Sequence, residues 1–215
     1  MPSRLISASV WPDNLIPKSV SVTMDRPVFK GPKPLSGREQ VVAVDSGGWA
    51  ISYDNIVLAG SARYLAFRKI WAETVGAALP VYIAPDFGPH TPAVRFGMTS
   101  SPTNCYLSSS TARGATTIPV TNSSGYALQA GDYFEINGRL HVIRSISGSS
   151  WTIWPPLRSY YNGSSYQTNT PSLTSMEIYD PRCLMYAVSD SKSNSMTLGD
   201  NAVGSVSLEF VEANW

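Results

Sequence analysis

The sequence predicts a mainly β protein: an antiparallel β-sandwich with one flanking α-helix and a small inserted β meander or half-barrel. Three observations support this prediction. Short runs of alternating apolar and polar residues recur along the chain, as in Ser-Val-Ser-Leu-Glu-Phe at 205–210. Turn-forming residues separate these runs. One segment, residues 61–79, instead has the apolar spacing of an amphipathic helix.

The overall composition excludes several classes of protein. The chain has 215 residues, only 14% of them charged, and its 16 basic and 15 acidic groups leave a formal charge of +1. This balance argues against the basic surface of a general nucleic-acid binder. Aromatic and aliphatic residues run throughout, which argues against intrinsic disorder. Because no apolar run has the length of a signal peptide or a membrane span, we expect a protein that is made and used in water.

The N-terminal part predicts strands separated by turns. Residues 19–24 alternate strictly, with the apolar side chains at 20, 22 and 24, and Arg26-Pro27 ends the run. Residues 40–43 and 49–53 are predicted to pair as a hairpin across the Gly-containing segment 45–48.

A single helix is expected at about residues 62–78. Ser61 is its candidate N-cap and Pro80 its stop signal. Its apolar face is predicted to lie against a sheet and bury Phe67, Ile70, Trp71 and Val75.

The middle of the chain predicts a compact inserted unit, residues 100–162. Asn137-Gly138 is the strongest two-residue hairpin signal in the sequence, because both positions favour positive φ. A third strand follows the turn at 147–150 and stops at Pro155-Pro156. Strand patterns return in the C-terminal part, so residues 1–99 and 163–215 are predicted to form one discontinuous β domain.

No catalytic constellation emerges from the residue types. His141 is expected on the surface of a strand, and His90 has no second histidine or cysteine nearby to form a metal site. The acidic residues are scattered, and no nucleotide-binding or hydrolase motif occurs. Cys105 and Cys183 are predicted to be buried thiols, a disulfide being the alternative in an oxidising compartment. We therefore expect a protein without enzymatic activity, metal or cofactor.

Aromatic residues are the remaining functional signal. They gather around the end of the inserted unit, and exposed aromatic rings stack on sugars or anchor protein interfaces. The alternative for the tryptophans, Trp151 and Trp154, is that they fill the core of the inserted unit. The candidate interface or glycan contacts are Trp154, Tyr160, Tyr161 and Tyr166.

The inserted unit resembles a segment of tail proteins from long-tailed bacteriophages. The resemblance rests on an L-x-x-GD-x-F-x-I-x-G-x-L-x-V pattern followed by W-x-I-x-PPLR. It is carried by Leu128, Gly131, Asp132, Phe134, Ile136, Gly138, Leu140, Val142, Trp151, Ile153, Pro155, Pro156, Leu157 and Arg158. A strand at Gly47-Gly48-Trp49 followed by one amphipathic helix fits the same proteins. Within them, the distal tail proteins are the most similar.

That resemblance implies a tube-like β domain assembled as a hexameric ring between the tail tube and the baseplate hub or tail tip. Its partners would be copies of itself, the tail tube protein, the hub or tail-tip protein, and side fibres or a receptor-binding protein. Neither a membrane nor a specific nucleic-acid sequence would be bound. The protein would be assembled in the host cytoplasm and reside in the virion tail. A tube protein or minor tail protein fits nearly as well, and the alternative function is a host-adhesion or carbohydrate-binding module.

Overall fold

The structure is a computed structural model. It describes residues 8–25, 28–30, 41–43, 48–76, 79–86, 91–100, 102, 104–158, 160–161, 166–167, 169–188, 196–198 and 203–213. The strands and helices in chain order are β1 (Ser9–Val10), β2 (Ser19–Asp25), β3 (Val28–Lys30), β4 (Val41–Ala43), β5 (Gly48–Ala59), α1 (Ser61–Trp71), the π-helical turn η1 (Ala72–Gly76), β6 (Val81–Ile83), α2 (Pro92–Arg95), β7 (Cys105–Leu107), β8 (Thr111–Ala112), β9 (Thr117–Asn122), β10 (Tyr133–Ile136), β11 (Arg139–Ser147), β12 (Ser150–Trp154), β13 (Tyr160–Tyr161), β14 (Tyr166–Gln167), β15 (Asn169–Thr170), β16 (Cys183–Ala187), β17 (Met196–Leu198) and β18 (Val203–Glu212).

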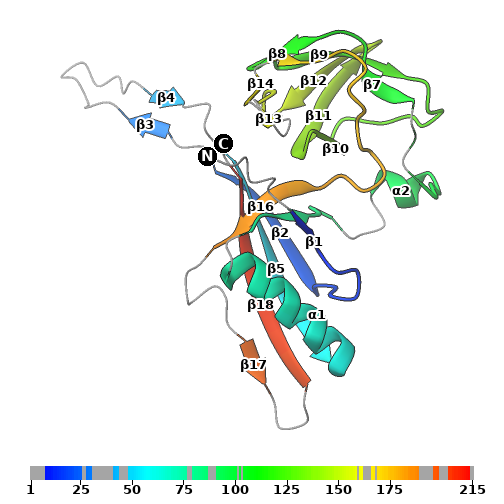
Figure 1. The fold of residues 1–215 in the computed structure, drawn as a ribbon. Coiled ribbons are helices and arrows are strands. Elements are labelled where there is room, and N and C mark those ends of the chain that lie inside the picture. The colour runs from blue at the N-terminus through cyan, green and yellow to red at the C-terminus, as the bar shows by residue number, and fades with distance from the viewer. Residues whose placement is uncertain are drawn as a thin grey trace.

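Strands from both ends of the chain form the larger sheet, which we call the main sheet (Figure 1). Its order is β1-β6-β16-β18-β5-β2, with β17 also paired to β18. All of these pairs are antiparallel except β1 with β6. The hairpin predicted between residues 40–43 and 49–53 is wrong. The long strand β5 pairs instead with β2 and β18, both of which continue its alternating apolar face, while β4 pairs with β3.

One face of the main sheet is packed and the other is open. Trp49, Ile51 and Tyr53 of β5 point into the core, where the Tyr53 ring meets Trp11 and Phe210 edge to face. On the opposite face of β2, β5 and β18 the side chains are exposed or half-buried, and most are small or polar, such as Ser21 and Ser205, while Val211 is apolar. The alternation predicted for residues 19–24 and 205–210 is therefore confirmed.

Helix α1 covers part of the packed face. Phe67 and Ile70 are buried as predicted, but Trp71 is 45% exposed, so the prediction that it belongs to the core is wrong. Trp71 is the last α-helical residue and lies on the rim of the buried face, one step beyond Ile70. Ser61 is the first helical residue rather than the N-cap. Gly60, with a positive φ of 81°, occupies the cap position.

A second, short helix was missed by the sequence prediction. It is α2, whose first turn is capped by the Thr91 side chain, which accepts a hydrogen bond from the Val94 amide. Thr91-Pro92 was a usable signal, since threonine at the N-cap and proline at the first position favour helix initiation.

The inserted unit contains a five-stranded sheet in the order β10-β11-β12-β9-β7. The predicted β10–β11 hairpin is confirmed, with φ values of 54° at Asn137 and 76° at Gly138. The predicted third strand, β12, pairs with β11 and ends at Trp154, directly before the two prolines.

Residues 173–177 bridge the two edge strands of this sheet. The Leu173 amide donates to the Leu107 carbonyl of β7 at 2.8 Å, and Glu177 exchanges two backbone hydrogen bonds with Glu135 of β10, at 2.8 and 3.0 Å. The curled sheet is thus closed into what we call the small barrel, and Met176 and Ile178 enter its core. The predicted fold class, mainly β with a flanking helix and an inserted half-barrel, is confirmed.

Residues 139–143 of strand β11 are covered on both sides, which overturns the prediction for His141. Leu140 packs into the core of the main sheet, while Ile143 packs into the small barrel. His141 is 1% exposed and stacks on Phe134 at a centroid distance of 5.4 Å. The predicted alternation of side chains along β11 is correct. The face that was expected to contact solvent, which carries His141, is instead covered by the core of the small barrel.

Candidate functional site

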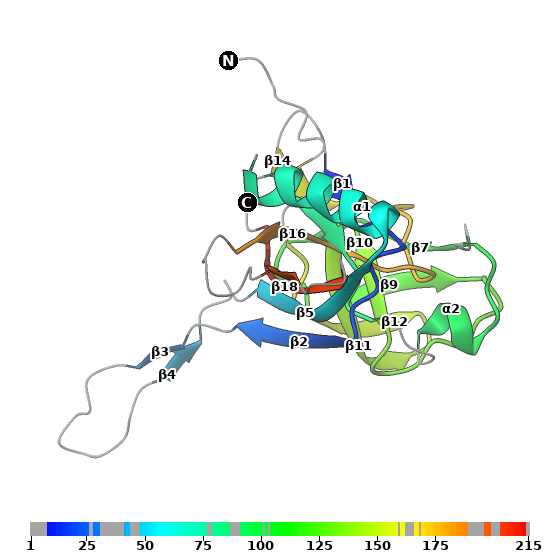
Figure 2. The same cartoon turned by 90° about the horizontal axis from the view of Figure 1, so that it is seen from below.

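The main sheet has an open edge along β2. This strand pairs with β5 over seven residues, and within the described part of the chain no strand pairs with its outer side. At the opposite edge, β1 covers β6 over only two residues. In Figure 2 the β3–β4 hairpin stands clear of both sheets beside β2. An unpaired strand edge is a template for pairing with another chain.

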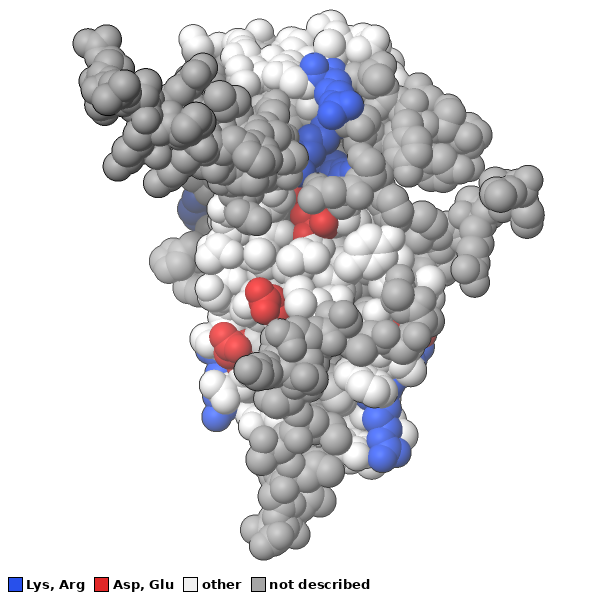
Figure 3. Space-filling view, turned by 90° about the vertical axis from the view of Figure 1, so that its left-hand side faces the viewer, with Lys and Arg blue, Asp and Glu red and all other residues white. Residues whose placement is uncertain are grey.

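Several large apolar side chains are exposed on the surface. Leu65 and Trp71 project from α1, with exposures of 62% and 45%, and Val211 projects from the open face of the main sheet. In the view of Figure 3, which shows one face only, uncharged residues predominate, with acidic groups near the middle and basic groups towards the two ends. Exposed apolar groups on a charge-poor surface are typical of protein–protein contact areas.

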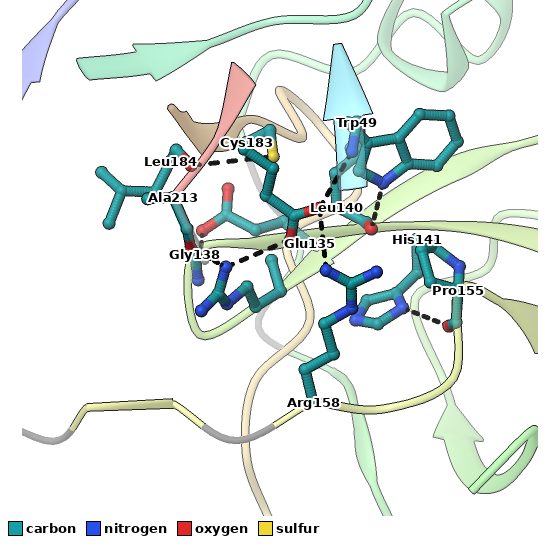
Figure 4. Close-up of polar contacts among 12 residues, drawn as sticks. Trp49, Glu135, Gly138, Leu140, His141, Pro155, Arg158, Cys183, Leu184 and Ala213 are labelled. Atoms are coloured by element: carbon teal, nitrogen blue, oxygen red, sulfur yellow. Dashed lines mark hydrogen bonds and ion pairs between the residues drawn. The ribbon is translucent and has the colours of Figure 1, made fainter. Parts of the chain in front are cut away.

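A buried ion cluster joins the main sheet to the small barrel. Glu212, near the end of β18, has a side-chain exposure of 1%, and its two carboxylate oxygens face Arg139 at 3.2 Å and Arg158 at 3.3 Å. One of these oxygens also accepts the Trp49 amide at 3.0 Å. Figure 4 shows the Trp49 side chain beside Leu140, and Arg158 near His141 and Pro155. We call Glu212, Arg139 and Arg158 the junction cluster.

Further hydrogen bonds cross the same junction. The Trp49 indole donates to the Leu140 carbonyl at 2.8 Å, and the Leu184 amide of β16 donates to the Gly138 carbonyl at 3.1 Å. Arg139 also donates to the Ala213 carbonyl. The β10–β11 hairpin is therefore held against the main sheet by charged, side-chain and backbone contacts together.

The four predicted contact residues fall at the end of the inserted unit. Trp154 is half-buried, and its indole Nε1 contacts the Met24 sulfur of β2, so it also joins the barrel to the main sheet. Tyr160 and Tyr161 form β13, and Tyr161 pairs with Tyr166 of β14. The side chains of these three tyrosines lie outside the described residues, and their role as contacts stays a prediction.

Two small cavities lie next to each other, beside the segments that follow β6 and precede β16. Their volumes are about 120 and 160 Å³, and both are lined by Asp86 and Asp180. Two of the acidic groups are paired: Asp180 with Arg182 and Asp132 with Arg95, each at 2.5 Å. Each cavity has the volume of about one side chain, so neither has the dimensions of a drug-sized ligand pocket.

Burial shifts the pKa of several groups near the junction. It raises the pKa of Glu135 to about 7 and lowers that of His141 to about 4. His141 Nδ1 lies 2.8 Å from the Pro155 carbonyl oxygen. Both cysteines are free and buried as predicted, and burial raises the pKa of Cys105 to about 12. His90 lies outside the described residues.

Some functional classes find no specific support in this arrangement. No group of three potential metal ligands occurs among the described residues. Within the same residues, no helix has the length and apolar character needed to cross a membrane. Comparison of the sequence with protein-family models and with curated proteins gave no match.

Proposed function

We propose that this protein is a structural subunit of a bacteriophage tail. It assembles into a ring, hexameric as in the distal tail proteins it resembles, and joins the tail tube to the baseplate hub or tail tip in the virion. The role requires complementary surfaces and no catalytic group.

The open edge and open face of the main sheet carry this proposal. A ring built by pairing between copies needs a strand whose outer side is available, and β2 supplies seven residues of it. A face that lines a channel must remain compatible with water, and most side chains on this face of β2, β5 and β18 are small or polar, such as Ser21, Thr23 and Ser205.

The position of the small barrel supports the same arrangement. Leu140 and Trp154 bring the barrel against Trp49 and Met24, which lie on the packed face of the main sheet. Helix α1 covers that face too. If the open face lines the channel, the helix and barrel lie on the outside of the ring, where they are accessible to further tail proteins.

Electron microscopy of the purified protein tests the proposal. We expect rings with a central channel in negatively stained images. The double substitution Ser21→Lys/Thr23→Lys places charge on exposed positions of β2 and is expected to abolish the rings while leaving the fold intact. Ser123→Lys, on an exposed turn of the inserted unit, is the matched control. Rings that persist in the β2 variant would count against this edge as the contact, and the absence of rings in the wild-type protein would contradict the proposal itself.

A further inference from the structure

Two glutamates face each other where the small barrel closes. Glu135 of β10 and Glu177 of the closing segment form an antiparallel bridge, with backbone hydrogen bonds of 2.8 and 3.0 Å in the two directions. Side chains directly opposite in such a bridge lie on the same face, and like charges in this position are destabilising. We call this pair the seam, since its bonds join β10 to the segment that closes the sheet.

Backbone amides hold both carboxyl groups in place. Glu135 accepts the amides of Gly138 and Arg182, each at 3.1 Å, one through each oxygen. Glu177 accepts the amides of Tyr179 and Asp180 through one oxygen, at 2.8 and 3.2 Å. Figure 4 shows the Glu135 carboxyl lying between the Gly138 turn and the start of β16. Neither side chain is free to turn away from the seam without losing these bonds.

The charges around the seam do not balance. Among the described residues, Arg182 is the cation that acts on Glu135, and its guanidinium is already paired with Asp180, at 2.8 and 2.5 Å. Tyr82 of β6 and the Cys183 thiol of β16 also face Glu135, and neither supplies a positive charge at neutral pH. With every acid ionised, three carboxylates would share one guanidinium. Burial, together with the charge of Glu177, raises the pKa of Glu135 to about 7.

We propose that the Glu135–Glu177 pair is a proton-operated latch on the small barrel. With one proton on the pair, the seam is closed. Once both carboxyls are charged, their repulsion and the cost of burying the second charge favour separation of residues 173–177 from β10. Separation exposes the backbone edge of β10, which is then available to pair with another strand. This latch does not depend on the proposed role in a phage tail.

Amide hydrogen exchange measured from pH 4.5 to 8.5 on the complete protein tests the latch. Glu135 becomes solvated in the open seam, so its pKa there returns toward the ordinary value of 4.5. The opening equilibrium constant is then expected to rise by about tenfold per pH unit between 4.5 and 7, a total of about 300-fold, and to level off above pH 7. Protection of the Glu135 and Glu177 amides, corrected for intrinsic exchange rates, reports this constant.

Controls within the chain separate the latch from a general change in stability. The Ile153 amide, bonded to the Thr116 carbonyl at 2.8 Å elsewhere in the barrel, is expected to show no such increase. Glu135→Gln is expected to remove the pH dependence at the seam, and Glu177→Gln to shift its midpoint to lower pH. Seam protection that is constant with pH, or that changes in parallel with Ile153, would overturn the latch, and this outcome requires only the wild-type protein.

Discussion

Substitution of Glu212 by glutamine is expected to lower the free energy of unfolding strongly, because this carboxylate is the counter-charge of two arginines. The Glu212 side chain is 1% exposed and that of Arg139 is 6% exposed, so solvent does not screen the pair. Glutamine has a similar shape but removes the negative charge that faces Arg139 and Arg158. Loss of one partner of a buried ion pair costs about 3–5 kcal/mol. In a chain of this size, that loss lowers Tm by about 6–20 °C.

Urea and thermal unfolding of Glu212→Gln and wild type measure this effect. Glu209→Gln is the matched control, since it lies three residues earlier on β18 and points to the open face. It is expected to change the free energy of unfolding by less than about 0.5 kcal/mol. A loss below about 1 kcal/mol for Glu212→Gln would refute the reasoning that an uncompensated buried charge results, because such a value is typical of exposed pairs.

Four further substitutions test other parts of the structure by the same unfolding measurements. Gly138→Ala is expected to cost about 1–2 kcal/mol, because φ is 76° at this position, a backbone conformation that strains any residue with a side chain. On α1, Phe67→Ala should cost about 3–5 kcal/mol and Trp71→Ala much less in the monomer, since only Phe67 is buried; equal losses would contradict the assigned helix face. Burial lowers the pKa of His141 from 6.5 to about 4, so the unfolded chain binds the extra proton and this residue's contribution to stability falls as pH drops through that range. The free energy of unfolding of His141→Phe minus that of wild type is therefore expected to rise by on the order of 3 kcal/mol as the pH falls from 6.5 to 4. A difference that stays constant with pH would contradict the burial of His141.

Local chemistry explains what the sequence predicted correctly. The β10–β11 turn follows from Asn137-Gly138 because both residues tolerate the positive φ that this hairpin needs. The burial of Phe67 and Ile70 follows from helical spacing, which did not distinguish them from Trp71 at the rim of the same face. These features depend on residues close together in the sequence, so they can be inferred without knowledge of the rest of the fold.

Contacts between distant segments explain what the sequence did not predict. The alternation in β11 predicted two different faces correctly, but not that a second core covers His141. Nothing near Glu212 in the sequence indicates that Arg139 and Arg158 surround it, since these residues lie more than 50 positions away. The pairing of Glu135 with Glu177 across the seam is likewise a consequence of how the barrel closes.

The mass of the purified protein in solution, measured by light scattering over a range of concentrations, tests the central proposal most directly. Assembly through the main sheet predicts a species of about 140 kDa, six copies of the 23.3 kDa chain, that is lost in the Ser21→Lys/Thr23→Lys variant. A mass of one chain at every concentration would contradict the proposal that this protein forms a ring.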